Sequence, residues 1–167
     1  MPNNPRVGHT LALALRRLED MILISLLLIM ITMAVLQIFL RNFFDSGIVW
    51  GDSLVRVLVL WIGLIGAMVA SRTDNHISID VISRYLPSRI KRVTGFLVHV
   101  FAAVVTALMA WFSLRFVRME MADNLIAFAN VPAWVCESII PVAFGVISLR
   151  YTLFSIKFFV RYNPKKP

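Results

Sequence analysis

Four long apolar segments, separated by short polar stretches, dominate the chain. The clearest is 21–40, which holds twenty residues without a single charge. A helix needs about 20 apolar residues to cross the hydrocarbon core of a bilayer. The pattern predicts spans over about residues 21–40, 54–71, 93–114 and 134–154. The expected fold class is therefore an all-α integral membrane protein with four transmembrane helices.

Two further segments are amphipathic and too short to cross a bilayer. In 9–20, leucines recur at helical spacing among charged residues. Two interpretations stay open for it: an interfacial helix on the membrane surface, or a cytosolic extension of the first span. The segment 77–86 is expected to be a second short interfacial helix, which Pro87 ends. All of these elements form a single membrane domain, residues 1–167.

Composition supports a membrane protein and changes how the charge is interpreted. Of 167 residues, 59% are hydrophobic, and the mean hydropathy is +0.81. A soluble domain averages about 45–50% apolar residues. The net charge of +8 could suggest nucleic-acid binding, but the basic residues lie between and beyond the apolar runs. We therefore expect phospholipids as partners and no nucleic acid, and we interpret the full-length first apolar run as a retained anchor.

The basic residues gather on one side of the predicted spans. Twelve of the 17 Lys and Arg residues lie in the N-terminal segment, the connection between the second and third spans, and the C-terminal tail. Three lie on the other face. Cytoplasmic loops carry the excess of Lys and Arg. Both termini of the chain are therefore predicted in the cytoplasm.

No pattern of catalytic or metal-binding residues is recognisable in the sequence. Of three histidines, only His99 lies within a predicted span, so a haem held between two spans is not expected. Glu-x-x-His pairs, a phosphate-binding glycine loop and a Gly-x-Ser-x-Gly elbow are all missing from the sequence. The single cysteine, Cys136, cannot form a disulfide within the chain. We expect no enzyme activity and no cofactor in this chain.

Five ionisable residues fall within or beside the spans and invite a functional interpretation. Asp52 and Arg56 are four residues apart, so they are predicted to pair on one helical face; ion handling is the alternative. Glu137 is interpreted as exposed to water or paired with a neighbouring residue, with a role in a proton relay as the alternative. His99 is interpreted as a packing residue rather than a ligand. Arg150 is expected to extend its guanidinium towards the membrane surface.

Small residues recur at intervals of four in the middle of the second span. Gly63 is followed by Ala67, and Gly66 by Ala70. Helices in a membrane associate by close packing at such residues. We predict a close helix contact on this face, either within the four-helix bundle or with a partner subunit.

Other residues mark the ends and bends of the spans. Arg41 closes the first span and Trp50 precedes the second, where tryptophan is ordinary at a membrane interface. Trp61 differs because it lies within a span. Pro132 suits the first turn of the fourth helix, and Pro141 is expected to kink it.

Several of these residues belong to an ordered set of motifs that covers about residues 41–154. In chain order they are Trp50-Gly-Asp52-Ser-Leu-Val-Arg56, Trp61-Ile-Gly63-Leu-Ile-Gly66-Ala67, Arg72-Thr-Asp-Asn-His76-Ile-Ser-Ile-Asp80, Leu86-Pro87, Val131-Pro132-Ala-Trp134 and Ile140-Pro141-Val-Ala-Phe144. The set resembles the small membrane subunit of tripartite ATP-independent periplasmic (TRAP) transporters. Members often carry a second acid where this chain has Ser53.

The resemblance implies a scaffold subunit in the bacterial inner membrane. It implies a large membrane subunit, in a stable heterodimer with this chain, that holds the substrate and sodium sites. It also implies a periplasmic binding protein that captures a carboxylate such as sialic acid or a C4-dicarboxylate. The alternatives are a membrane anchor for a redox enzyme and a free-standing small transporter. The residues expected to serve as membrane anchors or subunit interface are Arg41, Trp50, Asp52, Arg56, Trp61, Gly63, Gly66, Ala67, Ala70, His76, Asp80, Pro132 and Pro141.

Overall fold

The computed structural model of the chain describes residues 5–72 and 88–160. Four helical segments within these residues are long and apolar enough to cross a membrane. The elements in order are α1 (Pro5–Phe44), α2 (Gly51–Ala70), α4 (Ser88–Asp123), β1 (Ile126–Phe128), β2 (Val131–Pro132), α5 (Ala133–Glu137) and α6 (Ile139–Val160). The expected class of an all-α membrane protein with four spans is thus confirmed, with one small two-stranded hairpin that the sequence did not predict.

The first helix is longer than its apolar run. α1 is one continuous helix of 40 residues, so a separate interfacial helix over 9–20 was wrong, and that segment extends the span instead. Residues 9–44 contain neither glycine nor proline, so nothing in the sequence interrupts the backbone hydrogen bonding. At about 1.5 Å per residue the helix is about 60 Å long, twice the hydrocarbon thickness. It ends where Asp45 adopts a φ of 48°, a left-handed conformation that stops a helix.

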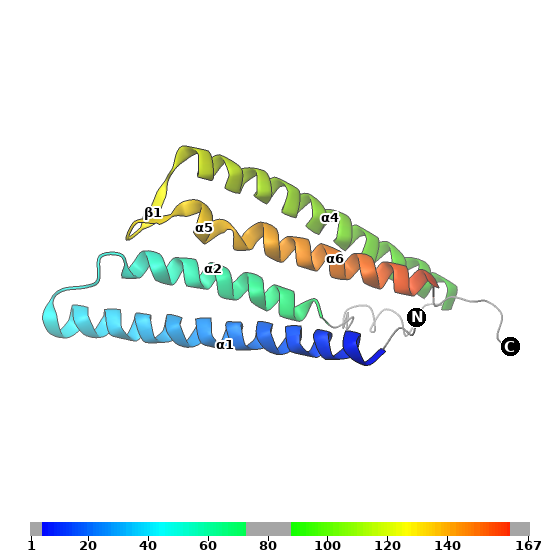
Figure 1. Ribbon diagram of the computed structural model, residues 1–167, viewed down its shortest axis with the longest axis horizontal. Coiled ribbons are helices and arrows are strands. Elements are labelled where there is room, and N and C mark those ends of the chain that lie inside the picture. The colour runs from blue at the N-terminus through cyan, green and yellow to red at the C-terminus, as the bar shows by residue number, and fades with distance from the viewer. Residues whose placement is uncertain (1–4, 73–87, 161–167) are drawn as a thin grey trace.

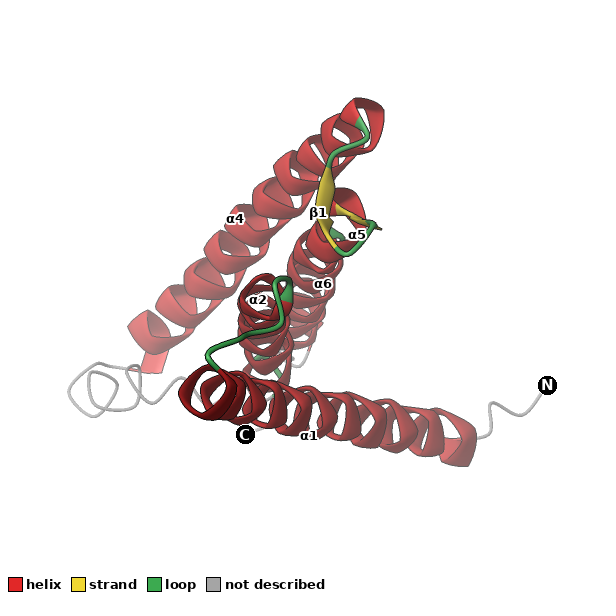
Figure 2. Cartoon of the chain, turned by 90° about the vertical axis from the view of Figure 1, so that its left-hand side faces the viewer, coloured by secondary structure: helices red, strands yellow, loops and turns green. Residues whose placement is uncertain are grey.

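The helices form a row with α2 and α6 at its centre. α1 packs on α2, α2 on α6, and α6 on α4, so α1 and α4 are the outer members (Figure 1). Seen from the end, α1 and α4 lean away from the central pair in different directions (Figure 2). α1 begins and α6 ends at one end of the bundle, called here the termini end. The α1–α2 connection and the hairpin lie at the other, called the turn end.

The buried core of the chain is small and central. It lies between α2 and α6, and its members are Met68, Ala143 and Ile147, flanked by Leu64, Val146 and Tyr151. The outer helices leave most of their large apolar side chains exposed. A bilayer does not penalise such exposure, because lipid tails are as apolar as leucine. The surface of the bundle is therefore suited to lipid or to other membrane helices.

The fourth span is broken near its start. α5 ends at Glu137, Ser138 forms a turn, and α6 begins at Ile139. Pro141 lacks the N–H that would bond the Glu137 carbonyl, and its ring crowds that carbonyl, so the interruption lies where a kink was expected. Pro132 lies in β2, directly before the first helical residue of α5, rather than within the first helical turn.

The hairpin turns at Ala129 and Asn130, which both adopt a positive φ, 42° and 66°. Two such residues are typical of the tight turns that suit the twist of paired strands. β1 and β2 pair antiparallel and lead directly into α5. The predicted interfacial helix over 77–86 lies outside the described residues, as do His76 and Asp80.

Candidate subunit interface and the contacts that hold it

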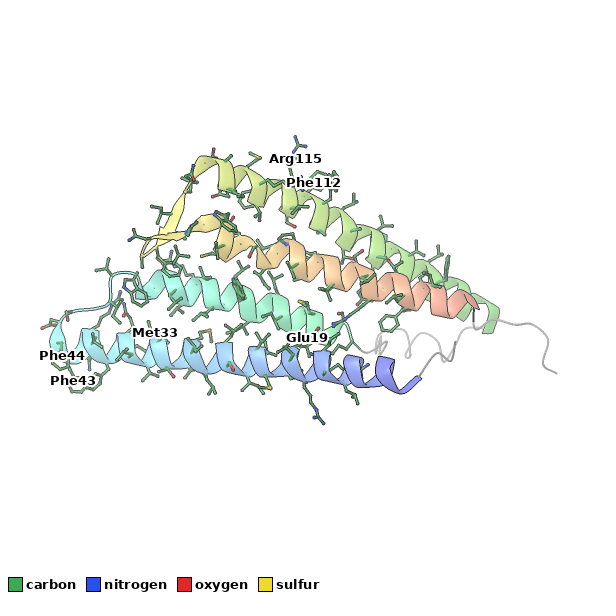
Figure 3. All side chains as sticks on the ribbon, viewed as in Figure 1. Glu19, Met33, Phe43, Phe44, Phe112 and Arg115 are labelled. Carbon is green, nitrogen blue, oxygen red and sulfur yellow. The ribbon has the colours of Figure 1, made fainter. Side chains whose placement is uncertain are left out.

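A cluster of charged side chains joins three helices at the termini end. Glu19 belongs to α1, and its side chain, labelled in Figure 3, extends towards the end of α2. Its Oε2 accepts a hydrogen bond of 2.7 Å from Arg72 Nε, and its Oε1 accepts one of 2.6 Å from Arg150 Nη2. The three side chains are largely buried, with exposed fractions of 17%, 11% and 21% in that order. One carboxylate of α1 therefore bridges a guanidinium that follows α2 and a guanidinium of α6.

Arg72 makes further contacts with α1. It donates to Asp20 Oδ1 at 2.6 Å and to the backbone oxygen of Arg16 at 3.0 Å. Burial lowers the pKa of the Arg72 guanidinium, but the hydrogen bonds and charges of Glu19 and Asp20 outweigh burial and leave that pKa raised. The guanidinium thus stays charged and holds the end of α2 against α1.

Arg150 also closes the end of α2. It donates to the backbone oxygen of Met68 and, at 3.2 Å, to Ser71 Oγ. The last carbonyls of a helix have no partner within the helix and carry its negative dipole end, which a cation stabilises. The sequence suggested that Arg150 can extend towards the membrane surface. The structure shows that its guanidinium pairs with Glu19 and caps α2.

At the turn end, the predicted pair of Asp52 and Arg56 was wrong. Asp52 pairs with Arg41 on α1, with 2.5 Å between Asp52 Oδ2 and Arg41 Nη2. Among the described residues Arg56 makes no ion pair. The tight connection between the helices brings the last turn of α1 beside the first turn of α2. A partner on the neighbouring helix thus replaces the one four residues away.

Gln37 fastens the same connection. Its carboxamide is buried, 6% exposed, donates to the Ile48 oxygen at 2.9 Å and accepts from the Ile48 N–H at 3.1 Å. A Cβ on Gly51 would lie 2.8 Å from Gln37 Oε1, so only glycine fits there without displacing the carboxamide. Gln37 was not predicted from the sequence, because a single glutamine in an apolar run gives little signal.

The small-residue face of α2 is open. An added Cβ at Gly63 or Gly66 would meet nothing within 4 Å. Gly63, Ala67 and Ala70 are exposed, and Gly66 is half-buried. Of the two alternatives for this face, packing inside the bundle is not what the structure shows, and contact with a partner subunit, which the family resemblance favours, stays a prediction.

Two tryptophans tie the turn end together. Trp50 is 40% exposed and stacks on Phe128 of the hairpin, with ring centroids 6.5 Å apart. Trp61 Nε1 donates to the Cys136 oxygen at 2.8 Å. That carbonyl lies one residue before the end of α5, so the indole joins α2 to the start of the fourth span.

His99 and Glu137 are both at least partly buried, but they differ in how their polar atoms are satisfied. His99 is 3% exposed, its Nδ1 lies 2.6 Å from the Gly95 oxygen, and its ring packs against Tyr151 and Phe154, as a packing histidine would. Glu137 Oε2 is buried without a hydrogen-bond partner in the described part of the chain. Residues 5–72 and 88–160 contain no group of three His, Cys, Asp or Glu arranged to hold a metal.

The chain was compared with protein families and with curated proteins, and it matches one family along most of its length. A family model described as the DctQ component of tripartite ATP-independent periplasmic transporters matches residues 28–161. The chain is 27% identical over 101 residues to a sialic acid TRAP transporter permease protein, SiaT, of Haemophilus influenzae, covering 60% of this chain and 16% of that protein. It is 26% identical over 106 residues to an isethionate TRAP transporter permease, DctMQ, of Oleidesulfovibrio alaskensis, covering 63% and 17%.

A third relative is closer to this chain in size. It is a C4-dicarboxylate TRAP transporter small permease protein, DctQ, of Pseudomonas aeruginosa, 23% identical over 107 residues, which cover 61% of this chain and 50% of that protein. The chain thus spans about half of this relative and about one sixth of the two larger permeases. These relatives are components of transporters and not enzymes. Because the family model covers most of its length, the chain belongs to the DctQ family of TRAP transporter components.

Proposed function

We propose that this chain is a scaffold: a small permease subunit that holds a large membrane subunit in position while the large subunit moves the substrate. The observation that carries the proposal is how its polar residues are used. The buried polar groups of α1, α2 and α6 bond one another, at Glu19, Arg72 and Arg150 and at Gln37. They hold helices together and do not converge on a transport pathway.

A large membrane partner is supported by the two larger relatives. Each contains the region that matches this chain as about one sixth of its length, and the name of one, DctMQ, joins two components. We assign the docking surface to the open face of α2, formed by Gly63, Ala67 and Ala70, which permits close approach of another helix. α1 is the second candidate surface, because only 6% of its most apolar window is buried, against 22% for the fourth span.

The excess of basic residues supports an orientation with the termini end in the cytoplasm of a bacterial inner membrane. The turn end then faces the periplasm, on the side where a substrate-binding protein docks. The proposed transporter takes up an organic acid, driven by sodium ions bound in the large subunit. The relatives named for sialic acid, isethionate and C4-dicarboxylates support an anionic substrate.

The test is reconstitution in liposomes with a sodium gradient. The chain alone should give no uptake of sialate, isethionate or a C4-dicarboxylate with its binding protein present, and addition of the large subunit should restore uptake. Uptake by the chain alone would establish a free-standing transporter, and a haem spectrum in the purified chain would establish a redox anchor. Either result would overturn the scaffold.

The docking surface is tested by Gly63→Leu, which adds bulk to the open face of α2. It should reduce co-purification with the large subunit about tenfold or more, since a side chain there holds two backbones apart. The thermal stability of the chain alone should not fall, because nothing lies within 4 Å. The matched control is Ala107→Leu, at an exposed position of α4. Equal loss from both variants would remove the assignment to α2.

A further inference from the structure

A groove at the turn end carries an excess of positive charge. It lies between α1 and α2 and has a volume of about 360 Å³. Pockets for small molecules range from about 300 to 1,000 Å³, so the groove suits one headgroup. Its lining residues are Ala34, Gln37, Ile38, Arg41, Asp52, Val55 and Arg56. Two arginines and one aspartate thus face a common space, with a formal charge of one positive unit.

The charges within the groove are unequally satisfied. Asp52 is held by Arg41 at 2.5 Å and by Gln37 Nε2 at 3.4 Å. Arg41 uses one terminal nitrogen for this contact and is 61% exposed, so the rest of its guanidinium is available. Arg56 is exposed and pairs with no carboxylate in the described part of the chain. The groove therefore presents two guanidinium groups to one anion.

The depth of the two arginines suits a lipid headgroup. Arg41 lies one turn before the end of α1, and Arg56 lies five residues, or about 7.5 Å, inside the start of α2. At this depth arginine extends its guanidinium to the polar boundary of the membrane. Guanidinium groups bind phosphate oxygens in a bidentate geometry that a flexible ammonium group does not match.

The walls of the groove are apolar below the charges. Ala34, Ile38 and Val55 continue the exposed apolar surface of α1, where Ile38 is 68% and Val35 60% exposed. A ligand with an anionic head and an apolar tail matches both halves of this surface. An acidic side chain of a partner protein would match only the charged half.

We infer that the α1–α2 groove binds the phosphodiester headgroup of a membrane phospholipid, with Arg41 and Arg56 on the phosphate and the acyl chains along α1. Asp52 positions Arg41 and limits the affinity, because it competes with the phosphate for the same guanidinium. The lipid lies in the leaflet at the turn end.

The test uses the full chain alone, in detergent, so that it does not depend on the large subunit. Dioctanoyl phosphatidylglycerol is titrated and the bound lipid is counted by native mass spectrometry. Dioctanoylglycerol, which has the tails without the phosphate, should not be retained. Inorganic phosphate, which has the anion without the tails, should not displace the lipid. Displacement by equal concentrations of phosphate would mean a free-anion site and overturn the lipid assignment.

Substitutions identify the groove. Arg56→Gln should weaken lipid retention about tenfold, the effect of losing one charge-assisted hydrogen bond. Asp52→Asn should strengthen retention, because it frees Arg41; a loss would overturn the role given to Asp52. The matched control is Arg115→Gln, since Arg115 projects from the far side of α4 (Figure 3). Equal weakening at Arg115 would mean general attraction of anions.

One outcome would assign the groove to a protein. If the chain alone retains no phosphatidylglycerol while Arg56→Gln abolishes co-purification with the large subunit, Arg56 pairs with an acid of that subunit and the lipid site is wrong. If the lipid is retained and responds to Arg56→Gln, the inference stands, whether or not the scaffold proposal survives its own reconstitution.

Discussion

Glu19 and Arg150 are 131 positions apart in the sequence, yet Glu19 Oε1 accepts a hydrogen bond of 2.6 Å from Arg150 Nη2. The contact joins the first and last helices across the end of α2, whose last carbonyls Arg150 also caps. Three helices are therefore fixed at one point by a single carboxylate. Removing one partner from a buried ion pair is costly because it leaves the other charge uncompensated.

We expect Glu19→Gln to be among the most destabilising single changes to the polar residues of the chain. It leaves two largely buried guanidinium groups without their shared carboxylate, at a cost of about 2–3 kcal/mol, below the value for a fully buried pair because all three groups keep some exposure. Thermal unfolding in nanodiscs measures the loss. Asp20→Asn is the matched control: Asp20 is 50% exposed, so the change should cost at most about 1 kcal/mol. Equal effects of the two would contradict a central role for Glu19.

The contact of Arg41 with Asp52 predicts a coupling between those two residues and none between Asp52 and Arg56. Both members of the pair are at least half exposed, so the coupling should be small, about 0.2–1 kcal/mol. A double-mutant cycle with Arg41→Ala and Asp52→Ala should detect it by thermal unfolding. The parallel cycle with Arg56→Ala should be additive. Coupling only in the second cycle would restore the pairing predicted from the sequence.

Gly51→Ala should destabilise the chain by about 0.5–1.5 kcal/mol, because the new Cβ would lie 2.8 Å from Gln37 Oε1 and would push the carboxamide away from its hydrogen bonds with Ile48. The same change at Gly63 meets no neighbour within 4 Å and should be neutral or slightly stabilising. In a Gln37→Ala background the cost of Gly51→Ala should largely disappear, since the obstructing carboxamide is gone. If the cost persists there, the backbone of Gly51 is responsible and not the side chain of Gln37.

The proposed orientation can be read by thiol labelling in a Cys136→Ser background. A cysteine at Ser46, in the α1–α2 connection, should react with a membrane-impermeant reagent on intact spheroplasts. A cysteine at Ser88 should react only after the membrane is opened, because the basic connection before α4 is predicted to be cytoplasmic. Labelling at 88 and not at 46 would reverse the orientation.

The number and approximate positions of the spans could be predicted from the sequence. A run such as 21–40 is so long and apolar that it must either cross a membrane or be buried. The break in the fourth span could also be predicted, because it depends on one residue: Pro141 lacks the N–H that a continuous helix needs. Even the continuity of α1 could have been inferred from the absence of glycine and proline in 9–44.

Contacts between helices were harder to predict from the sequence. Spacing along one helix suggested Asp52 with Arg56, but the choice of Arg41 depends on which helix end lies beside α2. Glu19 gave a signal that was not used: an acid just before the first span, with Arg72 directly after the second and Arg150 within the fourth. Charges at matching depths in different spans are candidates for pairing. Their partners follow only once the order of the helices is known.

Polar contacts hold α1 against its neighbours near both ends of the bundle, and their spacing has a consequence for the membrane itself. Glu19 holds α1 at one end and Gln37 holds it at the other, eighteen residues away, or about 27 Å along the helix axis. This is close to the roughly 30 Å of a hydrocarbon core. A thicker bilayer would pull one fastening into the acyl chains, whereas a thinner one would leave apolar turns in water, and either change would tilt or strain the pair. We therefore expect the spacing of Glu19 and Gln37 to make the α1–α2 pair most stable in a bilayer whose hydrocarbon core is close to that thickness.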